Sequence, residues 1–467
     1  MASITTKEEA PTAQSEAFNT SVKLKCVICT TVKLPGFGKE VLDSFVKYHL
    51  EIGFSHIYIF FDDANDASIG LIKAKYSINE VTIFLPGDDL KSKWSTMCLS
   101  YNDLRPYVED EVQARQRLNC EVALKEAYIQ KYDWLLHIDS DELFYSETYD
   151  DIRLHFRKLM DDGIYSLTYL NFEGVPEKLF EKNDEKAGDP DFFNYFKHIT
   201  LFRRHHSVVE MNSSSLEGMK YWERRRSHGQ YFLAYDIGKS AVRILPNVQC
   251  SNVHKFTIVG SKKNKQKLKS NPHRERVCTA VIDARNFDPK TFYETQDPVI
   301  LHYVVCGLPW LRAKYAMLGA FPNSWYGGKI PIAPSFHRDA RDLFVHNSRD
   351  NENNIRSFFK NQVMLDIMTD SSEYKNLISS GVCERIVKPR NILRRKESYN
   401  TYDTDGTICP NQTTTSKYAC KPYVGKAKVQ KIVQPGSHTK NDSNKINSNG
   451  MTYDKNWMIA NAVKKFL

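Results

Sequence analysis

The chain has 467 residues, and hydrophobic residues make up 41% of it. This composition is typical of a globular protein and excludes collagen-like, coiled-coil and wholly disordered chains. The formal net charge is +9, but residues 388–467 hold 15 Lys+Arg and 5 Asp+Glu, whereas residues 1–387 hold 50 and 51. The basic character therefore belongs to a C-terminal tail, and the neutral body argues against a nucleic-acid partner.

We expect no secretion signal in the N-terminal segment and no membrane-spanning helix. No stretch approaches the roughly 20 apolar residues of a membrane-spanning helix, and residues 1–21 are polar, lack an apolar signal core and are expected to be disordered. We therefore expect a soluble, cytoplasmic protein. The ten cysteines fit buried, reduced thiols better than metal ligands, because Cys26 and Cys29 fall on opposite faces of a strand and no second pair completes a zinc site.

The first part of the folded region alternates between strand-like and helix-like segments. Apolar runs predict buried strands, and 3.6-residue periodicity predicts the helices between them. In chain order, we expect a strand from Lys23 to Val32, a helix from Lys39 to Gly53, a strand from His56 to Phe61, a short helix from Ala67 to Lys75, a strand from Glu80 to Leu85, a helix from Glu109 to Tyr132 and a strand from Trp134 to Ile138. Strands joined by helical crossovers predict a parallel α/β sheet that binds ligands at its carboxyl ends.

Beyond Phe144 the pattern becomes α+β, with shorter strands and longer loops. The expected elements are a helix from Asp150 to Asp162, strands from Ile164 to Phe172, Lys197 to Arg203, Gly229 to Tyr235, Ser240 to Ile244 and Val299 to Val305, and a helix from Pro309 to Gly319. We therefore expect a main domain over residues 22–330 and a helical extension over 331–395. A linker or disordered segment over 396–450 and a short amphipathic segment over 451–467 would follow.

The segment WLLHIDSDELF, from Trp134 to Phe144, is the sharpest chemical feature. It places Asp139 and Asp141 directly after a buried strand. Aspartates two residues apart on an extended segment share a face, so both can approach one hard divalent cation that bridges a diphosphate. An acidic turn after a strand is the ordinary alternative, but the long apolar approach and the preceding β-α-β pattern favour a metal site.

These residues resemble the metal-binding DxD motif of glycosyltransferases with the GT-A fold, in particular the family 2-like and family 92 group. The segments CTTVKLPGFGKEVLDSFVKYHLEIGFSHIYIFFDDANDAS, RQRLNCEVAL, YDIGKSAVRI and LHYVVCGLPWLRAKYAMLG resemble other motifs of that group. The resemblance runs from about Lys23 to about Gly319. It implies an α/β fold of the GT-A type, Rossmann-like with a mixed central sheet, plus a C-terminal extension.

The resemblance also implies roles for individual residues. Asp139, Asp141 and His302 would bind Mn²⁺ or Mg²⁺, although a histidine in an apolar strand is otherwise a core residue. The residues expected to contact the nucleotide-sugar are Thr30, Thr31, Asp62, Asp63, Gln116, Asn119, Asp139, Lys239, Arg243 and His254. Gln116 and Asn119 lie three residues apart on one helical face, so they either brace the site or touch the nucleotide.

The expected activity is that of a metal-dependent glycosyltransferase of the hexosyltransferase type. It would move a sugar from a nucleotide-diphosphate sugar to a hydroxyl of a glycan, protein or lipid acceptor, with inversion. Glu173, Asp189, Glu217 and Asp236 lie in the region that should supply the general base, and Asp189 is our candidate. The alternative is a non-catalytic protein that binds carbohydrate or a polyanion through a degenerate transferase domain, and the basic tail would allow peripheral membrane contact.

Overall fold

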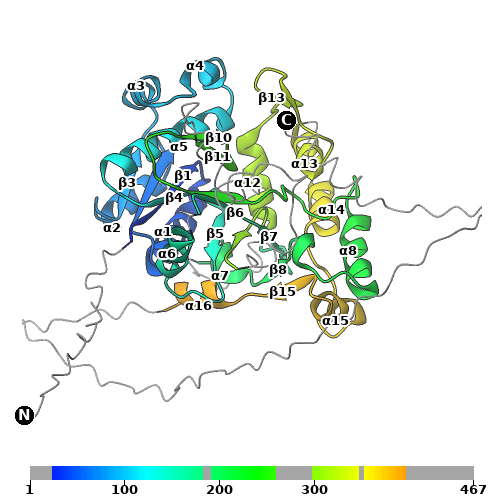
Figure 1. The fold of residues 1–467 in the computed structure, drawn as a ribbon. Helices are drawn as coiled ribbons and strands as arrows, with labels where there is room; N and C mark the ends of the chain where they lie inside the picture. Colours follow the sequence, from blue (N-terminus) through cyan, green and yellow to red (C-terminus); the bar gives the residue numbers. More distant parts are fainter. Residues whose placement is uncertain (1–23, 163, 182–190, 259–296, 346–351, 396–467) are drawn as a thin grey trace, which may run out of the picture. The chain divides into compact units, whose positions relative to one another are not determined.

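The computed structural model describes residues 24–162, 164–181, 191–258, 297–345 and 352–395, and Figure 1 shows how these residues are arranged. The expected disordered N-terminus, the linker at 396–450 and the amphipathic segment at 451–467 lie outside the described residues. Among the described helices, none combines the length and the apolar character that crossing a membrane requires.

A six-stranded mixed sheet forms the first half of the fold (Figure 1). Its order is β3-β2-β1-β4-β9-β6, in which the first four strands run parallel and β9 is antiparallel to both of its neighbours. The strands are β1 (Cys26–Val32), β2 (His56–Phe61), β3 (Val81–Phe84), β4 (Trp134–His137), β6 (Ser166–Tyr169) and β9 (Lys239–Arg243). This sheet confirms the expected α/β fold with a mixed central sheet.

Helices cover both faces of this sheet, which explains why its central strands are continuous apolar runs rather than alternating ones. Every residue of β1 and of β2 is buried. Ile28 packs in a core with α1, α2 and α6, whereas Cys29 packs in a second core with α3, α4 and α5. The bounds are α1 (Lys39–Glu51), α2 (Ser68–Lys75), α3 (Asp88–Met97), α4 (Tyr101–Leu104), α5 (Val112–Ile129) and α6 (Ile152–Asp161).

A second sheet of five strands follows in the order β15-β8-β7-β12-β5. Strand β12 runs antiparallel to β5 and parallel to β7, so His302 is the register partner of both Glu142 and Glu173. The strands are β5 (Glu142–Tyr145), β7 (Asn171–Gly174), β8 (Leu201–Arg203), β12 (Val299–His302) and β15 (Cys383–Arg385). Since β5 directly follows the turn after β4, this sheet meets the first one at the DxD motif.

The remaining described elements are two-stranded ladders and the helices of the second half of the chain. Two-stranded ladders join β10 (Val248–Asn252) to β11 (Lys255–Ile258) and β13 (Ser324–Trp325) to β14 (Ile330–Pro331). The helices are α7 (Tyr195–His198), α8 (Ser213–Arg225), α12 (Leu308–Leu318), α13 (Phe336–Val345), α14 (Glu352–Gln362), α15 (Ser372–Ser379) and α16 (Lys388–Leu393). The expected extension at 331–395 thus contains four helices and also β15, which pairs with β8.

Candidate functional site

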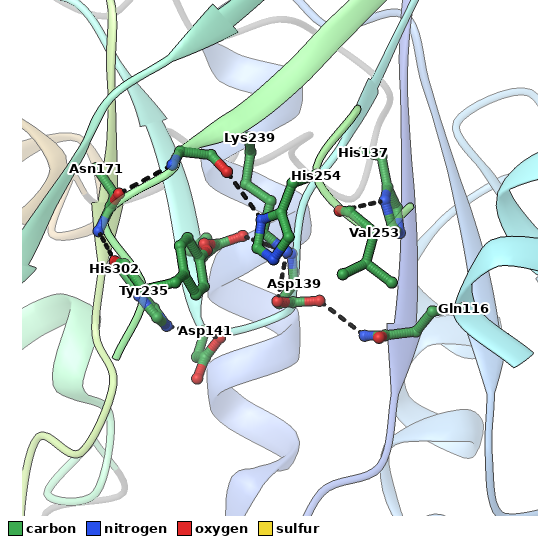
Figure 2. Close-up of polar contacts among 12 residues, drawn as sticks. Gln116, His137, Asp139, Asp141, Asn171, Tyr235, Lys239, Val253, His254 and His302 are labelled. Carbon is green, nitrogen blue, oxygen red and sulfur yellow. Dashed lines mark hydrogen bonds and ion pairs between the residues drawn. The ribbon is translucent and has the colours of Figure 1, made fainter. Parts of the chain in front are cut away.

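The DxD motif occupies a tight turn between the two sheets, not a continuation of β4. The strand ends at His137, the amide of Glu142 donates to the carbonyl of Asp139 (3.1 Å), and β5 begins at Glu142. The expectation that Asp139 and Asp141 share one face of an extended segment is therefore wrong. The turn sends each carboxylate to a different set of partners, as Figure 2 shows.

Asp139 is held from two sides. Its Oδ1 accepts from Nε2 of Gln116 on α5 (2.9 Å), and its Oδ2 lies 2.6 Å from Nζ of Lys239 at the start of β9 (Figure 2). The amide of Asp139 donates to Oε2 of Glu142 (2.7 Å), which is itself 3.6 Å from Nζ of Lys239. Lys239 is therefore a buried cation between two carboxylates.

The position of Lys239 is fixed by the chain just before it. Asn171 accepts from the amide of Gly238 (3.2 Å) and donates to the carbonyl of Tyr235 (2.7 Å), so one buried amide side chain holds both ends of this short loop. Gly238 has φ +68, and a Cβ there would lie 2.0 Å from the carbonyl oxygen of Tyr169. Only glycine fits this position, and it lets β9 start with Lys239 aimed at Asp139.

Asp141 faces His302 and Lys314. Its Oδ1 lies 3.8 Å from Nε2 of His302 on β12, and its Oδ2 lies 3.2 Å from Nζ of Lys314 on α12. The ring of His302 stacks on Tyr235 with centroids 4.9 Å apart (Figure 2), and within the part of the chain that the structure describes its buried Nδ1 has no hydrogen-bond partner. The fold thus brings His302 to Asp141, although the two residues are far apart in the sequence.

The charged groups of this cluster shift one another's pKa values. Burial would raise the pKa of Asp139, but the ammonium of Lys239 outweighs it and holds the pKa well below its usual range. Burial likewise opposes the charged form of Lys239, yet Asp139 and Glu142 raise its pKa above the ordinary value. Burial raises the pKa of Glu142, with further contributions from Asp139 and Asp141. The ion pair of Lys239 with Asp139 is therefore the stable charged unit of the site.

Two histidines flank the cluster as neutral groups. His254 lies in the loop between β10 and β11, where its Nδ1 contacts the carbonyl of Gly238 (2.9 Å) and its ring meets Tyr235 edge-on at 4.5 Å (Figure 2). Burial, together with Lys239, lowers the pKa of His254 to about 3, and burial also lowers the pKa of His302. Both rings therefore offer a lone pair rather than a positive charge at neutral pH.

The residues expected at the nucleoside line the carboxyl ends of β1 and β2. Thr31 accepts from Nδ2 of Asn119 (3.0 Å), while the buried hydroxyl of Thr30 has no hydrogen-bond partner among the described residues. Asn119 in turn accepts from Nε1 of Trp94 (3.0 Å). Asn119 and Gln116 therefore brace this edge of the sheet from one face of α5.

The two aspartates after β2 differ in their contacts. Asp62 is bound bidentately by Arg115, with N–O distances of 2.5 and 2.7 Å, whereas Asp63 accepts from the amide of Asn65 within its own turn (2.9 Å). The carboxylate of Asp62 is therefore already engaged by a guanidinium. Arg115 stands one residue before Gln116 on α5, so the same helix contacts both edges of the site.

Other sequence candidates are not brought to the turn. Arg243 pairs in register with Trp134, at the amino end of β4, and its guanidinium lies over the ring of Tyr165 at 5.2 Å. Asp189 lies outside the described residues. Glu173 is buried and accepts from Arg203 and from two backbone amides, and Glu217 is on α8 in ion pairs with Lys220 and Arg224.

Sequence reasoning missed several members of the site. Lys314, Tyr235 and Arg115 contact site residues, and although each lies in a segment that resembles a family motif, none was singled out as a site residue. The available signal for Lys314 was its place in the segment LHYVVCGLPWLRAKYAMLG, twelve residues after His302 and on a helix that returns toward the same edge. Glu142 was visible in the sequence next to the DxD, but its burial against Lys239 was not.

The donor set at Asp141 fits a divalent metal. A hard cation about 2.1 Å from each of two ligands accommodates the 3.8 Å between Oδ1 of Asp141 and Nε2 of His302. Within the described ranges, Asp139, Asp141 and His302 do not bring three ligand atoms within 4.8 Å of one another. Asp139 is instead tied to Lys239, so the pair of Asp141 and His302 is the part of the predicted triad that suits an ion.

Comparison with known proteins gives distant relatives. No family model matches the chain. Two proteins of Arabidopsis thaliana are similar to it: Glycosyltransferase-like At2g41451 is 23% identical over 85% of this chain and 80% of its own length, and Glycosyltransferase-like At3g57200 is 21% identical over 79% and 64%. Among solved structures, core-mannan synthase A from Aspergillus fumigatus, in an Mn/GDP form, is 12% identical and covers 38% of this chain and 51% of its own, with a TM-score of 0.20. That score is too low to support an inference about this chain.

Proposed function

We propose that this protein is a glycosyltransferase that moves a sugar from a nucleoside-diphosphate sugar to an acceptor hydroxyl. The observation that carries the proposal is the turn after β4, where Asp139 and Asp141 stand at the carboxyl edge of a parallel α/β sheet with a lysine against each carboxylate. Ligands of open α/β sheets bind at this edge. The similarity to two glycosyltransferase-like proteins over most of the chain supports the same class.

The donor would lie along the edge from β2 to α12. Its nucleoside would rest near Thr30 and Thr31, and its diphosphate would reach the space between Asp141 and Lys314. Lys314 is suited to the diphosphate because its side chain is 31% exposed, whereas that of Lys239 is 1% exposed and already paired. Lys239 is therefore a positioning residue, and Lys314 is the cation that a phosphate can recruit.

Asp141 and His302 would hold Mn²⁺ or Mg²⁺. When bound, the ion neutralises charge that develops on the leaving diphosphate. His302 is prepared for this role because it is neutral, buried and fixed by Tyr235. Lys314 would shift from Asp141 toward a phosphate oxygen and so leave Oδ2 of that carboxylate free. Asp139 would keep the turn in place through Gln116 and Lys239.

Further details belong to the same proposal. The resemblance to the family 2-like and family 92 group supports a hexosyl donor and inversion at the anomeric carbon. Inversion requires a carboxylate that removes the acceptor proton from the face opposite the leaving group. Glu173 is poorly suited to that task, since Arg203 and the amides of Leu233 and Ala234 already bind its carboxylate.

One observation favours a second candidate, a binding domain without catalysis. Both aspartates of the motif are paired with lysines, and such pairing neutralises carboxylates that would otherwise attract a metal. A carbohydrate-binding or polyanion-binding protein would retain this arrangement without turnover. Binding of a polyanion should weaken steeply with salt, whereas donor turnover should depend much less on ionic strength.

The direct test is donor turnover by the full chain. Release of nucleoside diphosphate from a panel of sugar nucleotides is followed with and without Mn²⁺, in the native protein and in Asp141→Asn. We expect metal-dependent release that falls by about 10²-fold or more in the variant. Asp162→Asn removes a surface carboxylate paired with Lys158 and should keep full activity. Equal turnover in Asp141→Asn and in the native protein would refute the assignment of this site.

A further inference from the structure

A second group of metal-binding side chains lies buried beneath the candidate site. Cys29 on β1, Cys120 on α5 and His137 on β4 each offer one ligand atom, and these atoms all lie within 4.8 Å of one another. The exposed fractions of the three residues are 0%, 0% and 2%. None of them contacts the donor site through a hydrogen bond that the structure records, so the group is separate from the DxD turn.

The sheet explains why these residues meet. Cys29 and His137 are register partners on the parallel neighbours β1 and β4, so their side chains leave the same face of the sheet side by side. The helix α5 packs on that face and contributes Cys120 to the same core as Cys29. Cys26, three residues earlier on β1, points into the opposite core, as expected from its spacing. The sequence interpretation of Cys29 as a plain buried thiol missed this convergence.

His137 is oriented as a metal ligand. Its Nδ1 lies 3.1 Å from the carbonyl oxygen of Val253 (Figure 2), and because a carbonyl can only accept, Nδ1 carries the proton. The lone pair of the neutral ring is then on Nε2, which is buried and finds no hydrogen-bond partner in the described ranges. A histidine that ligates a metal typically donates its other ring N–H to a backbone carbonyl in this way. Without a metal, the buried Nε2 forgoes a hydrogen bond, which is unfavourable.

Cys250 on β10 lies beside this group, although its sulfur is not within 4.8 Å of all three ligand atoms. Its side chain is fully buried, its thiol donates to the carbonyl of Asn252 (3.1 Å), and the thiols of Cys120 and Cys250 raise or lower each other's pKa as close neighbours do. Three sulfur atoms and one imidazole nitrogen are a donor set of structural zinc sites, and sulfur ligands select zinc over hard cations such as Mg²⁺. Arg117 donates to the carbonyl of Cys250 from Nε (3.3 Å) and Nη2 (3.2 Å), which places a positive charge beside the cluster.

We propose that Cys29, Cys120, Cys250 and His137 bind one Zn²⁺ ion as a structural centre. Binding replaces the proton on each of the three thiols, and three protons leave to solvent, so the complex carries one net negative charge that faces Arg117. A tetrahedral zinc ion holds its ligand atoms about 3.5–3.8 Å apart, so the side chains of Cys29, Cys120 and His137 contract around it by up to about 1 Å. Cys250 moves farther than these three to complete the four ligands. The ion would join β1, β4, α5 and β10.

This centre would stiffen the elements that carry the donor site. Asp139 follows His137 by two residues, and Gln116, which donates to Asp139, precedes Cys120 by one helical turn. An ion that fixes α5 against β4 therefore also fixes the hydrogen bond between Gln116 and Asp139. The metal site does not depend on the proposed transferase activity, because none of its ligands is among the residues proposed to bind the donor.

The test measures metal content in the full chain, purified under reducing conditions and dialysed against a mild chelator that strips loosely held cations. We expect one zinc ion per chain in the native protein and loss of that zinc in Cys120→Ala and in His137→Gln. Cys26→Ala is the matched control, since it removes a buried thiol of the same strand on the opposite face, and it should keep the zinc. Full zinc in Cys120→Ala and His137→Gln would overturn the proposal.

A second measurement covers the case in which the variants fail to fold. The native protein is loaded with Co²⁺, which should give the sulfur-to-metal charge-transfer band and the intense d–d bands of a tetrahedral thiolate site. Cobalt bound at the DxD carboxylates lacks the sulfur band, so the two sites are distinguishable. Native protein that holds far less than one zinc ion per chain and shows no sulfur band would refute the centre. A disulfide between Cys29 and Cys120 in the native protein, detected by mass spectrometry, would also refute it.

Discussion

The ammonium nitrogen of Lys239 lies 2.6 Å from Oδ2 of Asp139, and this pair ties the first residue of β9 to the turn after β4. Lys239 also reaches Glu142, at 3.6 Å, and is buried at 1% exposure. The pair therefore also has a structural role: the ammonium of Lys239 neutralises Asp139 and lies beside Glu142 at the point where the two sheets meet. Removal of the lysine should affect folding as well as activity.

Lys239→Met should lower the free energy of unfolding by about 3 kcal/mol, because it leaves the partly buried carboxylate of Asp139 without a compensating charge. Urea unfolding of the two proteins measures the difference. Lys158→Met is the control, since Lys158 forms an exposed pair with Asp162 and its loss should cost less than about 0.5 kcal/mol. Equal stabilities of the two variants would show that the buried pair does not hold the turn.

Gly238→Ala should destabilise the fold by about 2 kcal/mol or more, because a Cβ would meet the carbonyl of Tyr169 and a left-handed φ disfavours alanine. Activity should fall together with stability, since Lys239 is the next residue. Gly70→Ala is the matched control: Gly70 is in α2 with open space around its Cβ, so alanine there should stabilise by up to about 1 kcal/mol. Thermal unfolding distinguishes the two, and a stable Gly238→Ala would contradict the account of the loop.

His302→Gln should raise the concentration of Mn²⁺ needed for half-maximal donor turnover by about tenfold or more, since one of two protein ligands is lost. Its effect on stability should be smaller, because Gln keeps much of the volume beside Tyr235. His228→Gln is the control, as His228 contacts Asp339 at the surface. An unchanged metal requirement in His302→Gln would make His302 a core residue that happens to face Asp141.

The buried His49 predicts that folding stability depends on pH. Its Nδ1 contacts the carbonyl of Phe45, its Nε2 accepts from the amide of Phe144, and burial lowers the pKa of His49 to about 3. The unfolded chain protonates this ring near pH 6.5. Between these two pH values the unfolded state binds more protons, so stability falls as the pH falls, by about 1.4 kcal/mol per pH unit from this residue.

Urea unfolding between pH 4.5 and pH 6 tests this contribution. The native protein should lose stability faster on acidification than His49→Gln, whose amide stays neutral and can still accept from Phe144. The difference between the two slopes isolates His49 from the other buried histidines, which act in the same direction. Parallel slopes would mean that His49 takes up a proton as readily in the folded protein as in the unfolded chain.

Much of the first half of the fold was predictable because its signals are local. The runs of β1, β2 and β4 are continuous and apolar, and helix α1 begins at the expected Lys39. The second half of the fold was harder to predict from the sequence. The segment from Ile164 to Phe172, expected as one strand, forms β6 and β7 in different sheets with a break at Leu170, and the segment from Gly229 to Tyr235 forms no strand. Burial pattern alone does not tell which sheet a short strand joins.

The candidate site was likewise only partly predictable from the sequence. Asp139 and Asp141 were identifiable because they follow a buried strand in a motif, but their partners come from long range. Lys314 contacts Asp141 from 173 residues away, and Lys239 contacts Asp139 from 100 residues away. The metal-ligand group of Cys29, Cys120 and His137 depends on strand register and on the packing of α5. A single sequence carries no local signal for such pairings.

The measurement that tests the central claim most directly is the thermal stability of the full chain with a panel of sugar nucleotides, with and without Mn²⁺. A ligand that binds the native state raises the melting temperature. We predict that at least one sugar nucleotide raises it only in the presence of the metal, and that Asp141→Asn abolishes the shift while Asp162→Asn retains it. An equal shift in Asp141→Asn, or no shift with any sugar nucleotide in the native protein, would contradict a donor site at the DxD turn.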